Sequence, residues 1–378
     1  MKKIVLAFLT FSAILLSSCS KGSYMNVIPD NATAIIAVDA PNSGLKIDAE
    51  GIDTSEKIYL FETSDGALCL AAKCTLSGNG FNILQDKWVC GYDDGKMLIM
   101  GPVLPAQQDE TKKRTQRMLS QEEEESIVGT PMLQRLDSIT SPIALVAQSS
   151  ALPEQFATYF TLGAPRGANP SQVCIAAKIA LADGVMQILG TNFSINKSVA
   201  KALDDTNRNF RPLKGTFSAE TARQFFSLMM NVEGEKLLQM LQQNAGLQAL
   251  LAGINTAVDM DNILRSVDGD LAFMVDSTLT NMQIKAQLKN REFLKDIAYW
   301  KSSCPAGTSI SDRGKDTWLF QGDDLSFLFG VTSDNQFFGK LTRRQNADSS
   351  QMISAALEML TPFVGELKSI VYLIESEE

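Results

Sequence analysis

Short apolar stretches that alternate with polar turns make up most of the chain, and they predict β-strands. The clearest hairpin has two apolar arms, residues 171–182 and 185–193, joined by Asp183-Gly184, a pair typical of two-residue turns. Asp65-Gly66 and Asp94-Gly95 join shorter apolar segments in the same way. We therefore predict an antiparallel meander over residues 33–100 and a long hairpin after residue 170.

Other segments have the apolar spacing of amphipathic helices. Residues 107–125 are highly charged and predict a helix with a solvated face. Ser218 is placed to cap a helix over residues 219–230, and leucines form one broad apolar face over residues 235–254. Strands are expected again after these helices, and a last helix is expected at 349–360, before the final strand. The expected strands are 271–275, 282–288, 318–320, 325–331, 336–341 and 369–374.

These elements predict an α+β fold in which antiparallel sheets are packed by helices. Residues 211–215 are the best candidate boundary, so we expect an N-terminal α+β half over residues 27–210 and a C-terminal α+β half over residues 211–378. An order of strand, Asp-x-Trp-apolar, turn and apolar strand occurs in 71–100 and again in 284–328. This repeated order would fit two similar halves produced by duplication. A chance match is the alternative, because the spacing between the matched pieces differs.

The segment before Cys19 has the pattern of a lipoprotein export signal. A positive start is followed by an apolar, uncharged run, and Leu16-Ser17-Ser18-Cys19 matches the lipobox. The run is too short to span a membrane stably. We therefore predict a signal peptide at 1–18 and a lipidated tether at 19–26 that binds the membrane through Cys19, the alternative being a buried N-terminal helix.

The composition is globular and acidic, with 45% hydrophobic residues, a net charge of −9 and a pI near 4.8. Nucleic acid is not an expected partner, because phosphate binding needs clustered Lys and Arg. The chain has no histidine, which excludes Ser-His-Asp and Cys-His hydrolysis, zincin motifs and histidine-anchored metal sites. Chemistry that uses carboxylates alone, or a Ser–Lys pair, stays open.

Besides Cys19 the chain has five cysteines, an odd number that leaves at least one unpaired in an oxidising compartment. They are Cys69, Cys74, Cys90, Cys174 and Cys304. No C-x-x-C spacing exists, and the first four lie in apolar segments, where a free thiol behaves as a small buried hydrophobe. We interpret most of them as core residues, and a bridge from Cys69 or Cys74 to Cys90 stays open.

A resemblance follows from the residues after the lipobox. Val27 to Ala34 has the pattern Val-Ile-Pro-x-x-Ala-x-Ala and precedes a strand, which resembles the opening of an uncharacterised Bacteroidetes lipoprotein family, a domain of unknown function. The resemblance implies a signal peptide and a long α+β body, and no functional residues carry over. Ser20 is not the aspartate of inner-membrane retention, and no acidic export run follows Cys19, so we expect the outer membrane, facing the periplasm.

Two groups of residues resemble catalytic or metal-binding motifs. Ser194 and Lys197 fit Ser-x-x-Lys, and Ser333-Asp334-Asn335 matches the second motif of penicillin-recognising enzymes. The third motif is missing, since Lys214-Gly215-Thr216 has the wrong order and precedes Ser333. The aspartate pairs that could suggest calcium lack a complete loop, and one member, Asp259, is better placed to cap a helix; the pairs are Asp259 with Asp261, Asp268 with Asp270, and Asp323 with Asp324. We predict no catalytic, cofactor-binding or metal-binding residues.

The expected function is that of a membrane-anchored periplasmic or outer-membrane lipoprotein of unknown role, more simply a non-enzymatic binding or scaffold protein than an enzyme. Its expected partner is an envelope protein or a hydrophobic ligand, with the apolar segment 225–254 as a candidate groove. The alternative is a cell-envelope glycan or peptidoglycan hydrolase, which needs two carboxylates roughly 5 to 10 Å apart in a cleft.

Overall fold

The computed structural model describes residues 23–45, 50–151, 161–165, 167–243, 248, 255, 258–277, 280–343 and 368–375. The chain divides into two compact units, Met1–Ala147 and Gln148–Glu378. The predicted signal peptide, Cys19 and the predicted helix at 349–360 lie outside the described residues. The expected boundary at 211–215 falls within the second unit, where Phe210–Arg211 pairs with a strand of the same unit.

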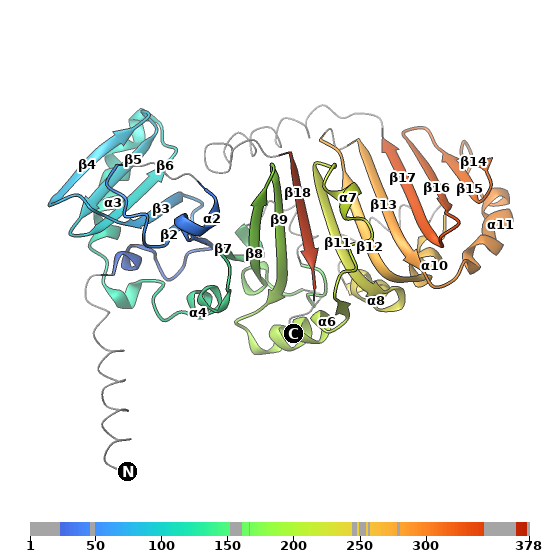
Figure 1. Cartoon of the computed structure of the whole chain (residues 1–378), viewed down its shortest axis with the longest axis horizontal. Coiled ribbons are helices and arrows are strands. Elements are labelled where there is room, and N and C mark those ends of the chain that lie inside the picture. Colours follow the sequence, from blue (N-terminus) through green and yellow to red (C-terminus); the bar gives the residue numbers. More distant parts are fainter. Residues whose placement is uncertain are drawn as a thin grey trace, which may run out of the picture. The chain divides into compact units, whose positions relative to one another are not determined.

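The first unit is an antiparallel sheet with the strand order β7-β1-β2-β3-β6-β5-β4 (Figure 1). Its strands are β1 Ala34–Val38, β2 Ile58–Glu62, β3 Leu68–Lys73, β4 Asn79–Leu84, β5 Trp88–Asp93, β6 Lys96–Gly101 and β7 Ile143–Gln148. Its helices are α2 Ala40–Ser43, α3 Gln108–Leu119 and α4 Pro131–Ser138, with short 3₁₀ turns at Tyr24–Val27, Pro105–Gln107 and Glu123–Glu125. Helix α3 packs on β5 at Gly91, where any side chain would overlap Thr115 of the helix.

The second unit is a mixed sheet with the strand order β8-β9-β18-β11-β12-β13-β17-β16-β15-β14 (Figure 1). Its strands are β8 Cys174–Ala182, β9 Val185–Phe193, β10 Phe210–Arg211, β11 Phe226–Glu233, β12 Val267–Val275, β13 Asn281–Leu288, β14 Ser309–Gly314, β15 Thr317–Gln321, β16 Leu325–Val331, β17 Gln336–Arg343 and β18 Ser369–Ile374. Its helices are α6 Lys197–Asn207, α7 Ser218–Thr221, α8 Gly234–Gln243, α10 Met260–Arg265 and α11 Ile297–Ser302, with 3₁₀ turns at Ser149–Ala151, Pro170–Gln172 and Glu292–Asp296.

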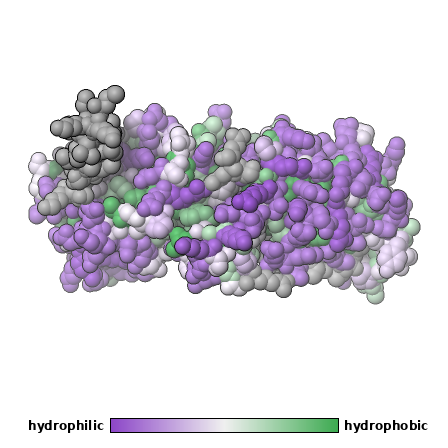
Figure 2. Space-filling view, turned by 90° about the horizontal axis from the view of Figure 1, so that it is seen from below, coloured by the Kyte–Doolittle hydropathy of each residue, from purple (hydrophilic) through white to green (hydrophobic). Residues whose placement is uncertain are grey.

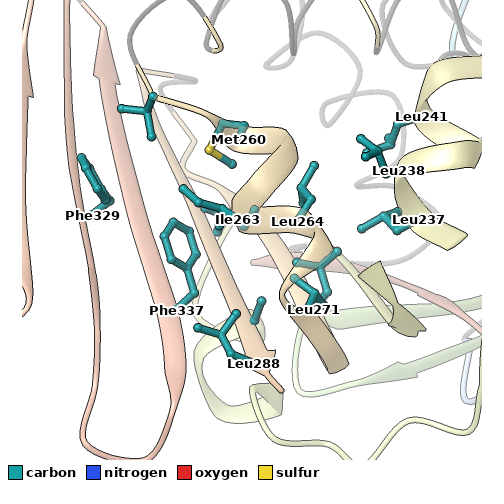
Figure 3. Packing of buried hydrophobic residues seen from close by; sticks show 14 of the residues in the cluster. Leu237, Leu238, Leu241, Met260, Ile263, Leu264, Leu271, Leu288, Phe329 and Phe337 are labelled. Carbon is teal, nitrogen blue, oxygen red and sulfur yellow. The ribbon is translucent and has the colours of Figure 1, made fainter. Parts of the chain in front are cut away.

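One face of this second sheet forms the main core of the unit. Alternate side chains of the strands pack there against α8, α10 and α11. Figure 3 shows Ile263 and Leu264 of α10 among side chains from α8 and from the strands, including Leu271 and Phe337. Each such side chain stabilises the fold by about 1.5 to 3 kcal/mol through burial, which explains why the short helices lie on this face.

The opposite face of the sheet is covered near β18 and β11 by residues 212–222, which include α7. Phe217 of this segment is buried against Met229, Ala272, Met274 and Val371, all on that face. The packing holds the segment over the sheet and forms the roof of the site described below.

The predicted fold class was wrong. The described residues contain eighteen strands, the sheet of the second unit is mixed, and the described helices are short, with α3 the longest at 12 residues. β18 is the strand that makes the sheet mixed, because it pairs parallel to both β9 and β11. The fold is therefore strand-dominated, in place of antiparallel sheets packed by helices.

The expectation of two similar halves fails as well. The units differ in size and in strand pairing, and the matched segments do not occupy equivalent places: β3 pairs with β6, whereas β13 pairs with β17. Residues 226–230, expected in a helix, belong to β11. This strand is buried on both faces at the middle of the sheet, so its apolar residues form a continuous run that lacks strand alternation.

Candidate functional site

A pocket of about 300 Å³ lies between the 212–222 segment and the sheet of the second unit. Its floor is apolar and comes from neighbouring strands: Met229 of β11, and Val371 and Leu373 of β18. The remaining lining residues come from β9, from the covering segment and from the end of β18; they are Gln187, Leu213, Lys214, Gly215, Ser218, Thr221, Ala222 and Glu375. We call this cavity the 212–222 pocket.

The pocket exists because a buried carboxylate holds its roof. Asp270 of β12 is fully buried, and its Oδ1 and Oδ2 accept the backbone N–H groups of Lys214 and Thr216 at 3.0 and 2.9 Å. Asn231 of β11 donates its Nδ2 to Asp270 at 2.9 Å and to the Pro212 carbonyl at 3.1 Å. These bonds satisfy a buried carboxylate that would otherwise be costly to desolvate.

Two further contacts fix the ends of the covering segment. The Leu213 N–H donates to Glu375 Oε1 at 2.9 Å, joining the segment to the residue after β18. The Thr221 carbonyl accepts the hydroxyls of Ser227 and Ser369 at 3.1 and 3.3 Å. The roof is therefore bound to β11, β12 and the end of β18 by polar contacts in addition to the packing of Phe217.

Several polar side chains at the rim of the pocket form no hydrogen bond or ion pair with the described residues. Among the described residues, the Lys214 ammonium forms no ion pair, and the side chains of Gln187 and Ser218 have no hydrogen-bond partner. Glu220, the one carboxylate of the 212–222 segment, is paired with Lys285 at 2.9 Å, and the hydrogen bond from Lys285 is the main cause that lowers the pKa of Glu220. The face of the molecule drawn in Figure 2 is mostly hydrophilic, with small hydrophobic spots.

A second pocket, of about 290 Å³, lies in the first unit and is mainly polar. Its lining includes Arg114, Arg117, Ser64 and Glu125. Arg114 is occupied by a two-pronged pair with Asp65 at 2.6 and 2.7 Å, and hydrogen bonds from Arg114 lower the pKa of that carboxyl to about 2. The lining of each described pocket holds one carboxylate, so neither has the carboxylate pair that a glycan hydrolase needs.

The structure does not bring the Ser-x-x-Lys and Ser-Asp-Asn motifs together. Ser194 donates its hydroxyl to the Gln172 carbonyl and accepts the Asn196 N–H at 3.0 Å, which is a turn role, while Lys197 begins α6. Ser333 lies between β16 and β17, and β17 is five strands from β9 in the sheet order. At about 4.8 Å per strand, roughly 24 Å separates the two motifs.

Three of the aspartates in these pairs have structural roles. Asp259 accepts the Asn262 N–H at 2.9 Å and caps α10, which confirms the predicted cap. Asp268 pairs with Arg211 at 2.8 Å, and Asp270 holds the pocket roof. No group of three or more His, Cys, Asp or Glu residues in the described parts of the chain could hold a metal ion.

The five described cysteines are free, and four of them are buried. Burial raises the pKa of the Cys69 thiol to about 12 and that of Cys174 to about 11. The pKa of Cys90 is raised to about 11, mainly by burial and secondarily by nearby Cys74. No bridge from Cys69 or Cys74 to Cys90 is formed, and these thiols pack as core residues.

Sequence reasoning missed the residues that build the pocket. The sequence places Lys214 in the candidate boundary at 211–215 and in an incomplete catalytic motif, and it places Asp270 in an incomplete calcium pair. The one local signal was Asp270 itself, a charged residue next to the apolar run of β12. Its partners are 56 and 54 residues away along the chain, so no local pattern could connect them.

Comparison with known proteins gives one match. Residues 71–356 match the family described as Domain of unknown function (DUF4836), a range that covers most of the chain and parts of both units. The chain belongs to this family. Searches of curated proteins and of solved structures matched nothing. The expectation of an uncharacterised family is thereby confirmed. No helix of the described residues is long and apolar enough to cross a membrane.

Proposed function

We propose that this DUF4836 protein is a lipid-anchored envelope protein that binds a small amphipathic ligand in the 212–222 pocket. The observation that carries the proposal is the contrast inside the pocket between an apolar floor and unpartnered polar rim groups. Ligand sites in proteins commonly combine apolar walls with a few polar groups that orient the ligand, and their volumes begin near 300 Å³. A non-enzymatic binding role fits this arrangement without any catalytic group.

The distribution of polar groups around the pocket favours a ligand site over a gap left by imperfect packing. Asp270 is fully buried and its oxygens hold the roof, whereas the exposed side chains of Lys214, Gln187 and Ser218 line the pocket and have no protein partner among the described residues. A ligand in the pocket would exchange water for its own polar groups at these exposed side chains. Binding then combines burial of apolar surface with new polar contacts.

The anchoring part of the proposal is supported by the lipobox pattern that ends at Cys19. A thioether-linked diacylglycerol on Cys19, with an N-acyl chain after cleavage, would hold the mature chain at the outer membrane facing the periplasm. The test is the mass of the N-terminal peptide of the membrane-extracted protein. We expect a triacylated Cys19 and loss of membrane association in Cys19→Ser, with Cys304→Ser as the matched control; a soluble, unmodified wild type would refute anchoring.

The binding part is tested with three six-carbon probes, hexanol, hexanoate and hexylammonium, by saturation-transfer NMR on the full-length chain in lipid nanodiscs. We expect saturable binding of at least one of the three probes by wild type. Ala222→Trp should abolish it, because exposed Ala222 lines the pocket and the indole fills the opening. Ala219→Trp is the matched control, since Ala219 is exposed on the same segment but does not line the pocket. Equal binding by both variants would contradict the proposal.

A further inference from the structure

The charges at the rim of the 212–222 pocket narrow the class of ligand. Its lining contains one cation, Lys214, and one anion, Glu375, and no ion pair joins them among the described residues. One oxygen of Glu375 accepts the Leu213 N–H at 2.9 Å, and its other oxygen has no partner in the described part of the chain. The lining of the pocket therefore presents one charged side chain of each sign.

A ligand with a single charge fits this rim poorly. A fatty acid could meet Lys214 but would bring its carboxylate near Glu375, and an alkylamine would bring its ammonium near Lys214. Like charges placed side by side across an interface disfavour the wrong partner, whereas complementary potentials favour the right one. A ligand with one ammonium and one carboxylate matches both groups.

The floor and the volume specify the rest of the ligand. Met229 and Val371 are buried under Phe217, so the apolar surface that a ligand can cover comes from half-buried Leu213 and Leu373. A volume of about 300 Å³ corresponds to about ten water molecules. That space suits a molecule of one or two amino-acid residues. Ser218 and Gln187 add donors and acceptors that a peptide group can use.

We propose that the 212–222 pocket binds a short zwitterionic peptide with apolar side chains. The ligand's carboxylate meets Lys214, its ammonium meets Glu375, and its side chains cover Leu213 and Leu373. This inference rests on the proposed function, since it names the ligand class of the same pocket.

The experiment compares three peptides by calorimetric titration of the full-length chain in nanodiscs: leucyl-leucine, its N-acetyl derivative without the ammonium, and its amide without the carboxylate. We expect wild type to bind leucyl-leucine about tenfold to a hundredfold more tightly than either derivative, as for loss of one charge-assisted hydrogen bond. In Lys214→Gln, leucyl-leucine and its amide should bind alike. In Glu375→Gln, leucyl-leucine and its N-acetyl derivative should bind alike.

The matched control is Lys289→Gln, an exposed lysine outside the pocket, which should leave all three affinities unchanged. Equal binding of the three peptides to wild type overturns the zwitterion inference, while the proposed function stands. Binding of hexanol without binding of any peptide likewise overturns the zwitterion inference and leaves the proposed function standing. If neither the six-carbon probes nor the peptides bind, the proposed function fails together with the inference.

Discussion

Replacing Asp270 with alanine should loosen the roof of the pocket and destabilise the second unit. The substitution removes the acceptor for the Lys214 and Thr216 N–H groups and for Asn231 Nδ2, which lie 2.9 to 3.0 Å from the carboxylate. Each donor left buried without a partner costs about 1 to 3 kcal/mol. With three donors and partial relaxation, we expect a loss of about 3 kcal/mol in the free energy of unfolding.

A neighbouring aspartate provides the control. Asp268 precedes Asp270 on the same strand by two residues, but its side chain is 43% exposed and its one ion pair is with Arg211 at 2.8 Å. Exposed pairs of this kind are worth about 0 to 1 kcal/mol. Asp268→Ala should therefore cost less than about 1 kcal/mol, and Asp270→Asn, which keeps one acceptor oxygen, should fall between the two alanine variants.

The assay is urea unfolding followed by tryptophan fluorescence in a Trp88→Phe background. Trp88 is the one tryptophan of the first unit, so the remaining signal, from Trp300 and Trp318, reports the second unit. Hydrogen exchange gives the local result: the Lys214 amide should exchange faster in Asp270→Ala. Equal stability of Asp270→Ala and Asp268→Ala, with unchanged exchange, would refute the assigned role of the buried carboxylate.

Two further results are expected. Gly234→Ala should destabilise the second unit by about 1 to 3 kcal/mol, because the new methyl group would overlap the Leu264 carbonyl where α8 meets α10, whereas Gly322→Ala meets only ordinary contacts; urea unfolding of both variants decides this. Native-state alkylation at pH 8 should modify half-buried Cys304 well before Cys69, whose pKa of about 12 leaves about one thiol in ten thousand ionised, and mass spectrometry of timed samples showing equal rates would contradict the burial assigned to Cys69.

The turn-forming residues explain why some strands could be predicted accurately from the sequence. Asp183 and Gly184 both have positive φ, 52° and 79°, as the predicted two-residue turn requires, and β9 has the predicted bounds. The last strand, at 369–374, was likewise confirmed. Local sequence determines these features because each depends on residues adjacent in the chain.

The sheet order could not be predicted in this way. β18 inserts between β9 and β11, so residues near the end of the chain pair with strands that precede them by more than 130 residues. The faces of β11 are both buried, one by the helices of the main core and the other by the 212–222 segment, and this burial removes the alternation that would identify β11 as a strand. The pocket depends on the same insertion, because Val371 and Leu373 of β18 complete its floor. The long-range pairing of β18 thus explains why neither the mixed sheet nor the pocket could be predicted from local sequence.

The most direct test of the binding proposal follows the ¹³C-methyl NMR signal of Met229 in the full-length chain during a titration with leucyl-leucine and, separately, with hexanol. Met229 is on the pocket floor, and Met132, buried in the first unit, is the internal control. Our account predicts a saturable shift of the Met229 methyl with an unchanged Met132 signal, and loss of that shift in Ala222→Trp. A Met229 signal that stays fixed at saturating concentrations of both ligands would contradict the account.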